Sequence, residues 1–183
     1  MSRIGKKPVD VPANVNVTVS GRNVTVESGD KRLSIEHRPE VQVAYEAEQR
    51  RIVVTRQNDE RQSRAYHGLT RALIQNMVIG VTAGFRKELD ISGVGWTGRV
   101  QGRTLALNVG YADTRQLPIP MGLDVQVNGS RIAISGADKQ AVGAFAATVR
   151  DQRPPEPYNA KGIKYVDEVI VKKEGKAFAG GGA

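Results

Sequence analysis

The chain has 183 residues, 39% of them hydrophobic and 25% charged, which is enough apolar material for one or two folded domains and too much for a disordered or fibrous protein. Its 27 Lys and Arg exceed its 19 Asp and Glu, and the formal net charge of +8 favours polyanionic partners, nucleic acid before acidic membranes. No run approaches the roughly 18 apolar residues of a membrane helix, and the absence of cysteine excludes disulfides, thiol catalysis and thiolate metal sites, which fits a cytoplasmic protein.

The first residues, "MSRIGKKPVDVP", are basic and lack the apolar stretch of a secretory signal. Residues 1–7 hold three Lys and Arg and no acidic residue. They are expected to form either an arm that becomes ordered on a phosphate surface or a simple mobile terminus. Arg3, Lys6 and Lys7 are the candidate contacts with nucleic acid.

The chain contains an internal repeat of about 80 residues. "GRNVTVES" from Gly21 resembles "GRTLALNV" from Gly102, and "RIVVT" from Arg51 resembles "RIAIS" from Arg131. Each copy then runs into a segment with helical periodicity. The sequence therefore predicts two tandem, duplicated domains.

Alternation with a period of two predicts several half-buried strands in each copy, and steps of three and four predict one amphipathic helix. The strands are expected at residues 15–19, 23–27, 52–55, 105–109, 124–127 and 132–135. The first helix is marked by Ala65, Leu69, Ala72, Leu73 and Met77, and the second by Ala141, Phe145, Thr148 and Val149. Strands followed by one late helix predict an α+β fold, in which each copy is a small, mainly antiparallel sheet with the helix packed on it.

These patterns divide the chain into four parts. Residues 1–7 form the basic arm, residues 8–82 the first repeat domain and residues 83–152 the second. Residues 153–183 form a basic C-terminal segment with a flexible, glycine-rich tail, which is expected to pack with the second domain. Lys and Arg exceed Asp and Glu by three, one, two and two in these parts, so most of the excess charge lies at the two ends.

"GVGWTG", residues 93–98, matches the dinucleotide-binding pattern G-x-G-x-x-G, but its context does not. A dinucleotide-binding loop must open a helix, whereas "RVQGRTLALNV" follows with strand alternation. A bulge or a close backbone approach explains the glycines better. Trp96 is either a stacking platform for a base or a plug at the end of the sheet, and Gly93, Gly95, Trp96 and Arg99 are candidate contacts with RNA.

Enzymatic and metal-dependent functions find little support. His37 and His67 are the only histidines, and they have no spacing typical of a metal site or a nucleophile–base pair. His67 is expected to be a packing or surface residue of the first helix, and Arg64 and Arg71, which share a helix face, are expected to be solvated. We expect no catalytic residue, no cofactor, no metal and no small-molecule substrate.

"PEPYNAKGIKY", residues 155–165, combines prolines, lysines, tyrosines and one glycine. Proline and glycine disfavour a helix or a central strand, so the segment is interpreted as a shaped loop. Cations and flat rings within a few residues suit a phosphate backbone and unstacked bases, and an ordinary surface turn is the alternative. The candidate RNA contacts in this region are Arg153, Tyr158, Lys161, Gly162, Lys164, Tyr165, Lys172, Lys173 and Lys176.

Five blocks of the sequence resemble the bacterial form of the ribosomal protein L-six family of the large subunit. They are "MSRIGKKPVDVP", "HGLTRALIQNMVIGV", "GVGW", "GADKQAVGAFAATVR" and "RPPEPYNAKGIKYVDEVIVKKEGK", in the family's order from Met1 to about Lys176. The family's last motif usually reads P-E-P-Y-K-G-K-G-I-R-Y, so Asn159, Ala160 and Lys164 are departures. Lys164 keeps the charge of arginine but not its planar fork, and the roles of positions 159 and 160 are open.

The resemblance implies a structural protein with two duplicated α+β domains that catalyses nothing. It implies binding to large-subunit ribosomal RNA, mainly through the second domain and the C-terminal segment, near the stalk base and the elongation-factor binding region. It also implies neighbouring ribosomal proteins there and a cytoplasmic location. Two alternatives are a nucleic-acid binding module outside the ribosome, which would ignore RNA fold, and an enzyme that uses residues 93–98 for a nucleotide.

Overall fold

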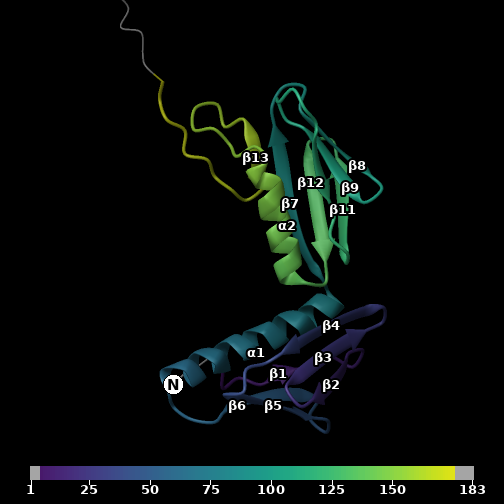
Figure 1. Cartoon of the computed structure of the whole chain (residues 1–183), viewed down its shortest axis with the longest axis vertical. Coiled ribbons are helices and arrows are strands. Elements are labelled where there is room, and N and C mark those ends of the chain that lie inside the picture. The colour runs from purple at the N-terminus through teal and green to yellow at the C-terminus, as the bar shows by residue number, and fades with distance from the viewer. Residues whose placement is uncertain (1–4, 176–183) are drawn as a thin grey trace, which may run out of the picture. The chain divides into compact units, whose positions relative to one another are not determined.

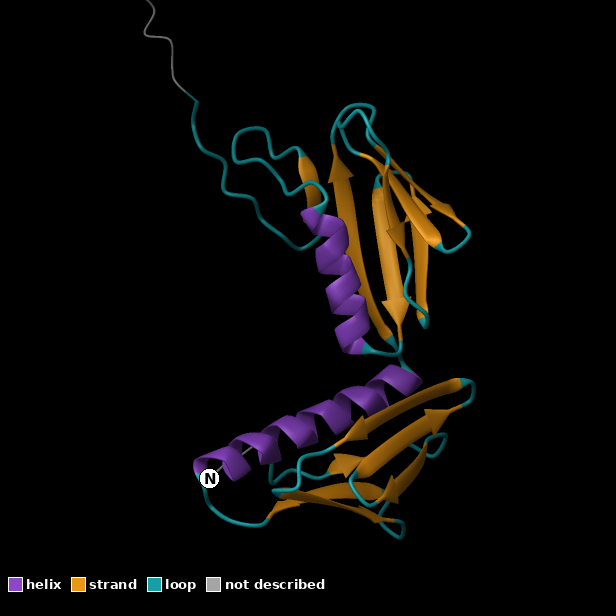
Figure 2. Ribbon diagram, in the orientation of Figure 1, coloured by secondary structure: helices purple, strands orange, loops and turns teal. Residues whose placement is uncertain are grey.

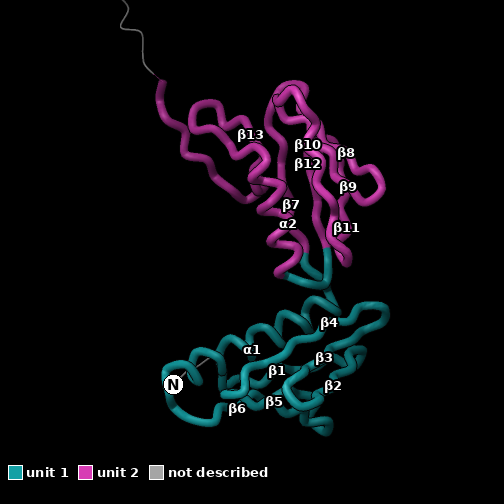
Figure 3. The backbone as a smooth tube through the Cα atoms, viewed as in Figure 1, with its two compact units in different colours: residues 1–85, 136–139 teal, residues 86–135, 140–183 magenta. Residues whose placement is uncertain are grey.

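Strands and two helices form two separate units in the computed structural model, which describes residues 5–175 (Figures 1 and 3). Unit 1 comprises residues 1–85 and 136–139, and unit 2 comprises residues 86–135 and 140–183. Arg3 and Lys176, which were predicted to contact RNA, lie outside the described residues.

Unit 1 contains two three-stranded sheets and one helix (Figure 2). One sheet has the order β2-β3-β4 and the other β1-β6-β5, with antiparallel pairing throughout. The elements are β1 (Val9–Asp10), β2 (Asn16–Ser20), β3 (Asn23–Ser28), β4 (Lys31–Glu36), β5 (Val41–Glu46), β6 (Arg51–Arg56) and α1 (Arg61–Thr82).

Both sheets and the helix of unit 1 share a single core. Alternation places Val24 and Val26 of β3 and Ile52 of β6 in it, because successive residues of a strand point to opposite faces. The C-terminal half of α1 adds Ile74 and Val78 to the same cluster. The core therefore lies between three layers rather than between one sheet and one helix.

The prediction of which side chains of α1 face the core is largely wrong. Of the predicted stripe only Met77 is buried, and Leu69 is 52% exposed. The N-terminal half of the helix instead buries His67, Ser63 and Thr70. This orientation is stabilised by the His67 ring, whose Nε2 lies 2.9 Å from the carbonyl oxygen of Val54 and donates to it. The packing interpretation of His67 is thus confirmed.

Unit 2 repeats the plan of unit 1 and adds one strand. Its sheets have the orders β10-β9-β8 and β11-β12-β7-β13. The elements are β7 (Phe85–Ser92), β8 (Thr97–Gln101), β9 (Thr104–Asn108), β10 (Arg115–Pro118), β11 (Leu123–Asn128), β12 (Arg131–Gly136), α2 (Lys139–Asp151) and β13 (Gly162–Tyr165). In α2, Phe145 and Val149 of the predicted stripe are buried.

The predicted α+β class and the duplication are confirmed. The repeated sequences form equivalent strands, β3 with β9 and β6 with β12, and one helix follows them in each copy. Each copy divides its strands between two small sheets, which the strand alternation alone did not separate.

Candidate nucleic-acid interface

The last four residues of the predicted loop form an edge strand. β13 pairs antiparallel with β7, with Ile163 opposite Ile91 and Tyr165 opposite Leu89. The interpretation of residues 155–165 as a loop throughout is therefore wrong at its C-terminal end. The prolines all precede the paired residues, so every N–H that the ladder needs is available.

Residues before β13 form a loop that is closed by backbone hydrogen bonds. The N–H of Ile163 donates to the carbonyl of Arg153 at 2.7 Å, and the N–H of Glu156 donates to that of Lys161 at 3.0 Å. Gly162 is buried with φ of +154°, and a Cβ there would lie 2.4 Å from Cα of Pro155. Only glycine allows this approach, so Gly162 shapes the loop and does not present a side chain.

Ala160 has the left-handed conformation, with φ of +59°. Its N–H donates to the carbonyl of Glu156 at 3.1 Å, which makes this conformation part of the closed loop. The glycine that the related motif has at this position would adopt it without strain. The departure at position 160 therefore keeps the loop's shape at some cost in stability.

Arginines and aromatic rings are stacked beside this loop. The guanidinium carbon of Arg153 lies 5.5 Å from the centroid of Trp96 and 4.7 Å from that of Tyr111. Arg115 lies 4.6 Å from the same tyrosine ring. Such cation–π contacts keep flat, charged groups in fixed positions at a surface.

The ring of Trp96 packs against the backbones of Gly93 and Gly110. A Cβ on Gly93 would lie 2.3 Å from Cδ2 of the ring, and one on Gly110 would lie 2.8 Å from Cζ2. The ring is half-buried, so it is packed by the glycines and still partly open to solvent. The close backbone approach expected for the glycines of residues 93–98 is what the structure has at Gly93.

An open hollow of about 300 Å³ connects the loop and the stacked groups. It is lined by Trp96, Tyr111, Arg153, Pro154, Glu156 and Lys161. Sequence reasoning had singled out Trp96, Arg153 and Lys161, and the fold brings Trp96 beside the other two, from which it is far apart along the chain. The hollow thus combines two cations, two aromatic rings and one carboxylate.

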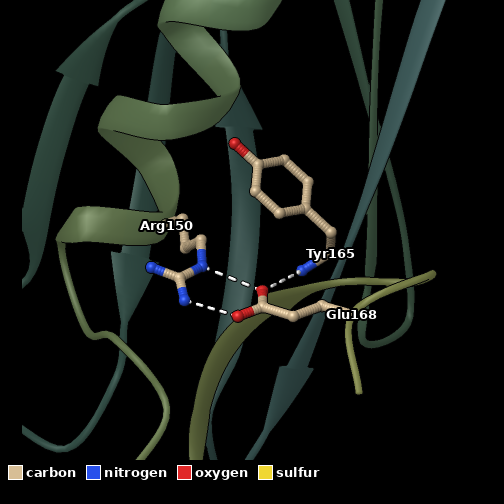
Figure 4. Close-up of polar contacts among 3 residues, drawn as sticks. All are labelled: Arg150, Tyr165 and Glu168. Atoms are coloured by element: carbon tan, nitrogen blue, oxygen red, sulfur yellow. Dashed lines mark hydrogen bonds and ion pairs between the residues drawn. The ribbon is translucent and has the colours of Figure 1, made fainter. Parts of the chain in front are cut away.

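An ion pair fixes the segment that follows β13 (Figure 4). Arg150 of α2 donates from Nε to Oε2 of Glu168 at 2.9 Å and from Nη2 to Oε1 at 2.5 Å, and the N–H of Tyr165 donates to Oε2 at 3.1 Å. The hydrogen bonds from Arg150 lower the pKa of Glu168 below its ordinary value, and the same bonds raise the pKa of Arg150. The C-terminal segment is therefore held to the end of α2.

The remaining predicted residues of unit 2 lie at several places on its surface. Lys164 stands directly opposite Asp90 on β7, and Lys87 lies 5.6 Å from the ring centroid of Tyr165. Tyr158 is 55% exposed, and the N–H of Lys173 donates to the carbonyl of Pro157 at 2.8 Å. Gly95, Arg99, Lys172 and Lys173 are exposed and do not line the hollow.

The described part of the N-terminal arm belongs to unit 1. Lys6 and Lys7 are exposed, and Arg71 of α1 donates from Nε to the carbonyl of Lys7 at 3.1 Å and from Nη2 to that of Pro8 at 3.3 Å. The prediction that Arg71 is merely solvated is wrong, because its guanidinium binds this segment.

Sequence reasoning missed Tyr111, Arg115, Pro154 and Glu156. One signal was available for Tyr111, since "NVGY" at residues 108–111 matches "GVGW" at residues 93–96 in its last three positions by residue type. Nothing in the linear sequence indicated that Arg115 or Glu156 would lie beside these rings.

Metal binding, dinucleotide binding and membrane insertion can each be compared with the described residues. Residues 5–175 contain no group of three or more His, Asp or Glu side chains that could hold a metal ion. β8 begins at Thr97, within residues 93–98, so a strand stands where a dinucleotide-binding loop needs a helix. Within the described residues, neither helix is long and apolar enough to span a membrane.

Comparison with known proteins adds independent information. The model of the family described as ribosomal protein L6 matches residues 11–84 and 92–166. The large ribosomal subunit protein uL6 of Caldicellulosiruptor saccharolyticus is 50% identical over 182 residues, which cover 99% of both chains. The proteins of the same name from Rhodopirellula baltica and Acaryochloris marina are 47% and 49% identical over 178 residues, which cover 97% of this chain and 98% of each relative.

Proposed function

Because this chain belongs to the ribosomal protein L6 family, we propose that it binds large-subunit ribosomal RNA, mainly through unit 2, and stabilises the fold of that RNA. The family consists of structural proteins of the ribosome and not of enzymes. The protein is then located in the cytoplasm, as part of the large ribosomal subunit. Its position within the subunit is near the stalk base and the elongation-factor binding region, beside neighbouring ribosomal proteins, as the resemblance implies.

The observation that carries the proposal is the hollow of unit 2 and the closed loop beside it. Arg153 and Lys161 supply positive charge, and Trp96 and Tyr111 supply flat rings. RNA is recognised through phosphates, shape and unstacked bases, for which these groups are suited. The wider interface adds Lys164, Tyr158 and the exposed lysines of the C-terminal segment.

The closed loop is suited to binding because it is already ordered. Its backbone hydrogen bonds and the packing of Pro155 on Gly162 hold Lys161 on a fixed frame. A surface that is ordered before binding loses less conformational entropy on association. Lysines on such a frame add affinity by releasing counterions from the RNA.

Removing the charges of Lys161 and Lys164 tests the proposal. The K161A/K164A double variant should bind large-subunit RNA more weakly, and the slope of log K against log salt should become shallower by about one to two units, since each phosphate contact contributes about 0.7 to 0.9. A K31A/R32A variant removes the same charge from exposed positions of β4 in unit 1. Its salt slope should be closer to that of the wild type than the slope of K161A/K164A is. Equal slopes for wild type and K161A/K164A would place the RNA elsewhere on the protein.

Sedimentation tests the assembly. A lysate is run through a sucrose gradient before and after a high-salt wash, and the protein is quantified in each fraction. The protein should stay with the large subunit through the wash. Loss during the wash would favour a nucleic-acid binding module that acts outside the ribosome.

A further inference from the structure

We propose that the hollow of unit 2 holds one unpaired guanine of the RNA, with the Watson–Crick edge of the base on the carboxylate of Glu156. The inference rests on the proposed RNA binding and goes beyond it, because it names the nucleotide that this hollow selects. The starting observation is that Glu156 lies in the hollow beside two cations, whereas a site for phosphate alone would have no carboxylate.

Glu156 lines the hollow together with Arg153 and Lys161. Its backbone is used in the loop, where the N–H donates to Lys161 and the carbonyl accepts from Ala160. Among the hydrogen bonds and ion pairs of residues 5–175, none involves the side chain of Glu156. Glu156 is half-buried, and within the same range its carboxylate oxygens have no hydrogen-bond partner, so they can accept hydrogen bonds from a ligand.

A free carboxylate does not help to bind phosphate, because it repels the anion and offsets the two neighbouring cations. It is useful for a ligand that carries both negative charge and strong donors. A nucleotide is such a ligand, since its phosphate is anionic and its base carries N–H groups. Lys161 can then hold the phosphate while Glu156 binds the base.

The hollow has the size and the surfaces for a single base. Its volume of about 300 Å³ is at the lower end of the range for small-ligand pockets. Trp96, Tyr111 and the guanidinium plane of Arg153 are flat groups of the kind on which unpaired bases stack. A base within a duplex is covered by its neighbours, so only an unpaired one can enter.

The donor pattern selects guanine among the four bases. An ionised carboxylate has two acceptor oxygens and no donor. Guanine presents two adjacent donors on its Watson–Crick edge, N1–H and the N2 amino group, which match both oxygens. Adenine and cytosine present one amino donor beside a bare ring nitrogen, and uracil presents one N–H between two carbonyls. Each of these three would leave an acceptor facing the carboxylate.

Binding by the full-length protein to RNA hairpins tests the preference. The hairpins share one stem and carry a single bulged G, A or inosine, and quenching of Trp96, the only tryptophan of the chain, reports on the hollow. Bulged G should bind at least about fivefold more tightly than bulged A, as expected for a bidentate base contact, with inosine between them because it lacks the N2 amino group. Equal affinity for the three hairpins would overturn the inference.

Substitution of the carboxylate gives a second test. The E156Q variant should lose the preference for G, whereas E174Q, which removes the same charge from an exposed position of the C-terminal segment, should keep it. In large subunits that carry E156Q, at least one guanine protected in wild-type subunits should become reactive to kethoxal, which modifies N1 and N2 of unpaired guanines. No gain of guanine reactivity in subunits that contain the variant would also overturn the inference.

The two proposals fail in different ways. If the hairpins bind equally while K161A/K164A still lowers the salt slope, only the selection of guanine is refuted. If K161A/K164A leaves the salt slope unchanged, the proposed RNA interface itself is refuted.

Discussion

Replacing Glu168 with Gln removes the charge that holds the C-terminal segment to α2 (Figure 4). The carboxylate accepts two hydrogen bonds from Arg150 and one from the N–H of Tyr165. The amide has nearly the same shape but only one oxygen, so it cannot accept all three. Arg150 then lacks the opposite charge of Glu168 beside it at the end of α2 and loses part of its hydrogen bonding.

The expected loss in the free energy of unfolding is about 2 kcal/mol. Hydrogen bonds to charged groups contribute roughly 1.5–3 kcal/mol when they are buried, and breaking a fully buried ion pair costs about 3–5 kcal/mol. The side chains of Arg150 and Glu168 are 27% and 23% exposed, so solvent weakens the pair and the lower part of these ranges applies.

The effect should depend on pH with a defined sign. Arg150 lowers the pKa of Glu168 in the folded protein, so the stabilisation is complete well above the ordinary value of 4.5 and is lost as the pH falls through the lower folded value. Gln does not titrate. The difference between wild type and E168Q should therefore be constant near neutral pH and shrink below about pH 4.5.

Urea unfolding of the full chain at pH 7 and at pH 3 measures this difference, and hydrogen exchange at the amide of Tyr165 reports on the local contact. E174Q is the matched control, since Glu174 is exposed and its replacement should change stability by less than about 0.5 kcal/mol. The reasoning fails if E168Q and E174Q unfold at the same urea concentration at pH 7, or if the loss caused by E168Q is as large at pH 3.

Three glycine and alanine substitutions test the backbone of unit 2, each by the urea midpoint of unfolding. G162A should lose about 2–4 kcal/mol, because its Cβ would lie 2.4 Å from Pro155 at a strained φ; wild-type stability would refute the close approach. G143A is the control within α2, where the added Cβ meets nothing within 4 Å, and it should gain about 0.5–1 kcal/mol. A160G should gain roughly 0.5–1 kcal/mol, because relief of about 1–2 kcal/mol of left-handed strain outweighs the greater freedom of glycine in the unfolded chain; a loss would mean that φ of +59° is not strained here.

The strands of the two repeats were predictable because their signal is local. Alternation in "NVTVE" and "LALNV" and the turn residues beside them are properties of a few neighbouring positions. The pairing of the strands into two sheets per unit is different, since it depends on contacts between residues far apart in the chain. Local patterns carry no information on that division.

The orientation of α1 was not predictable from apolar spacing. Leu69 and the alanines around it form a regular stripe, yet the fold buries His67 and Ser63 instead. The reason is tertiary, because the His67 ring finds the carbonyl of Val54 and lies close to Gly5. The hydrogen bond from Nε2 lowers the cost of burying the His67 ring, and no pattern within the helix indicates its partner.

The candidate site was predictable in its parts but not in its arrangement. Composition singled out Trp96, Arg153 and Lys161 because isolated aromatic and basic residues among glycines and prolines are recognisable. Glu156 was passed over, since a single glutamate in a basic protein is ordinary. Its place beside two cations, which makes it informative, exists only in the folded chain.

The difference between the two repeats explains why the candidate interface lies on unit 2. β1 has two residues and pairs with β6, whereas β7, in the equivalent position beside β12, has eight. A strand of two residues offers almost no free edge, but β7 offers enough for β13 to add as a fourth strand. β13 in turn closes the loop that carries Lys161 and begins the segment that Glu168 holds to α2. The closed loop and the C-terminal segment of unit 2 therefore depend on the long edge of β7, for which the two-residue β1 of unit 1 is no counterpart.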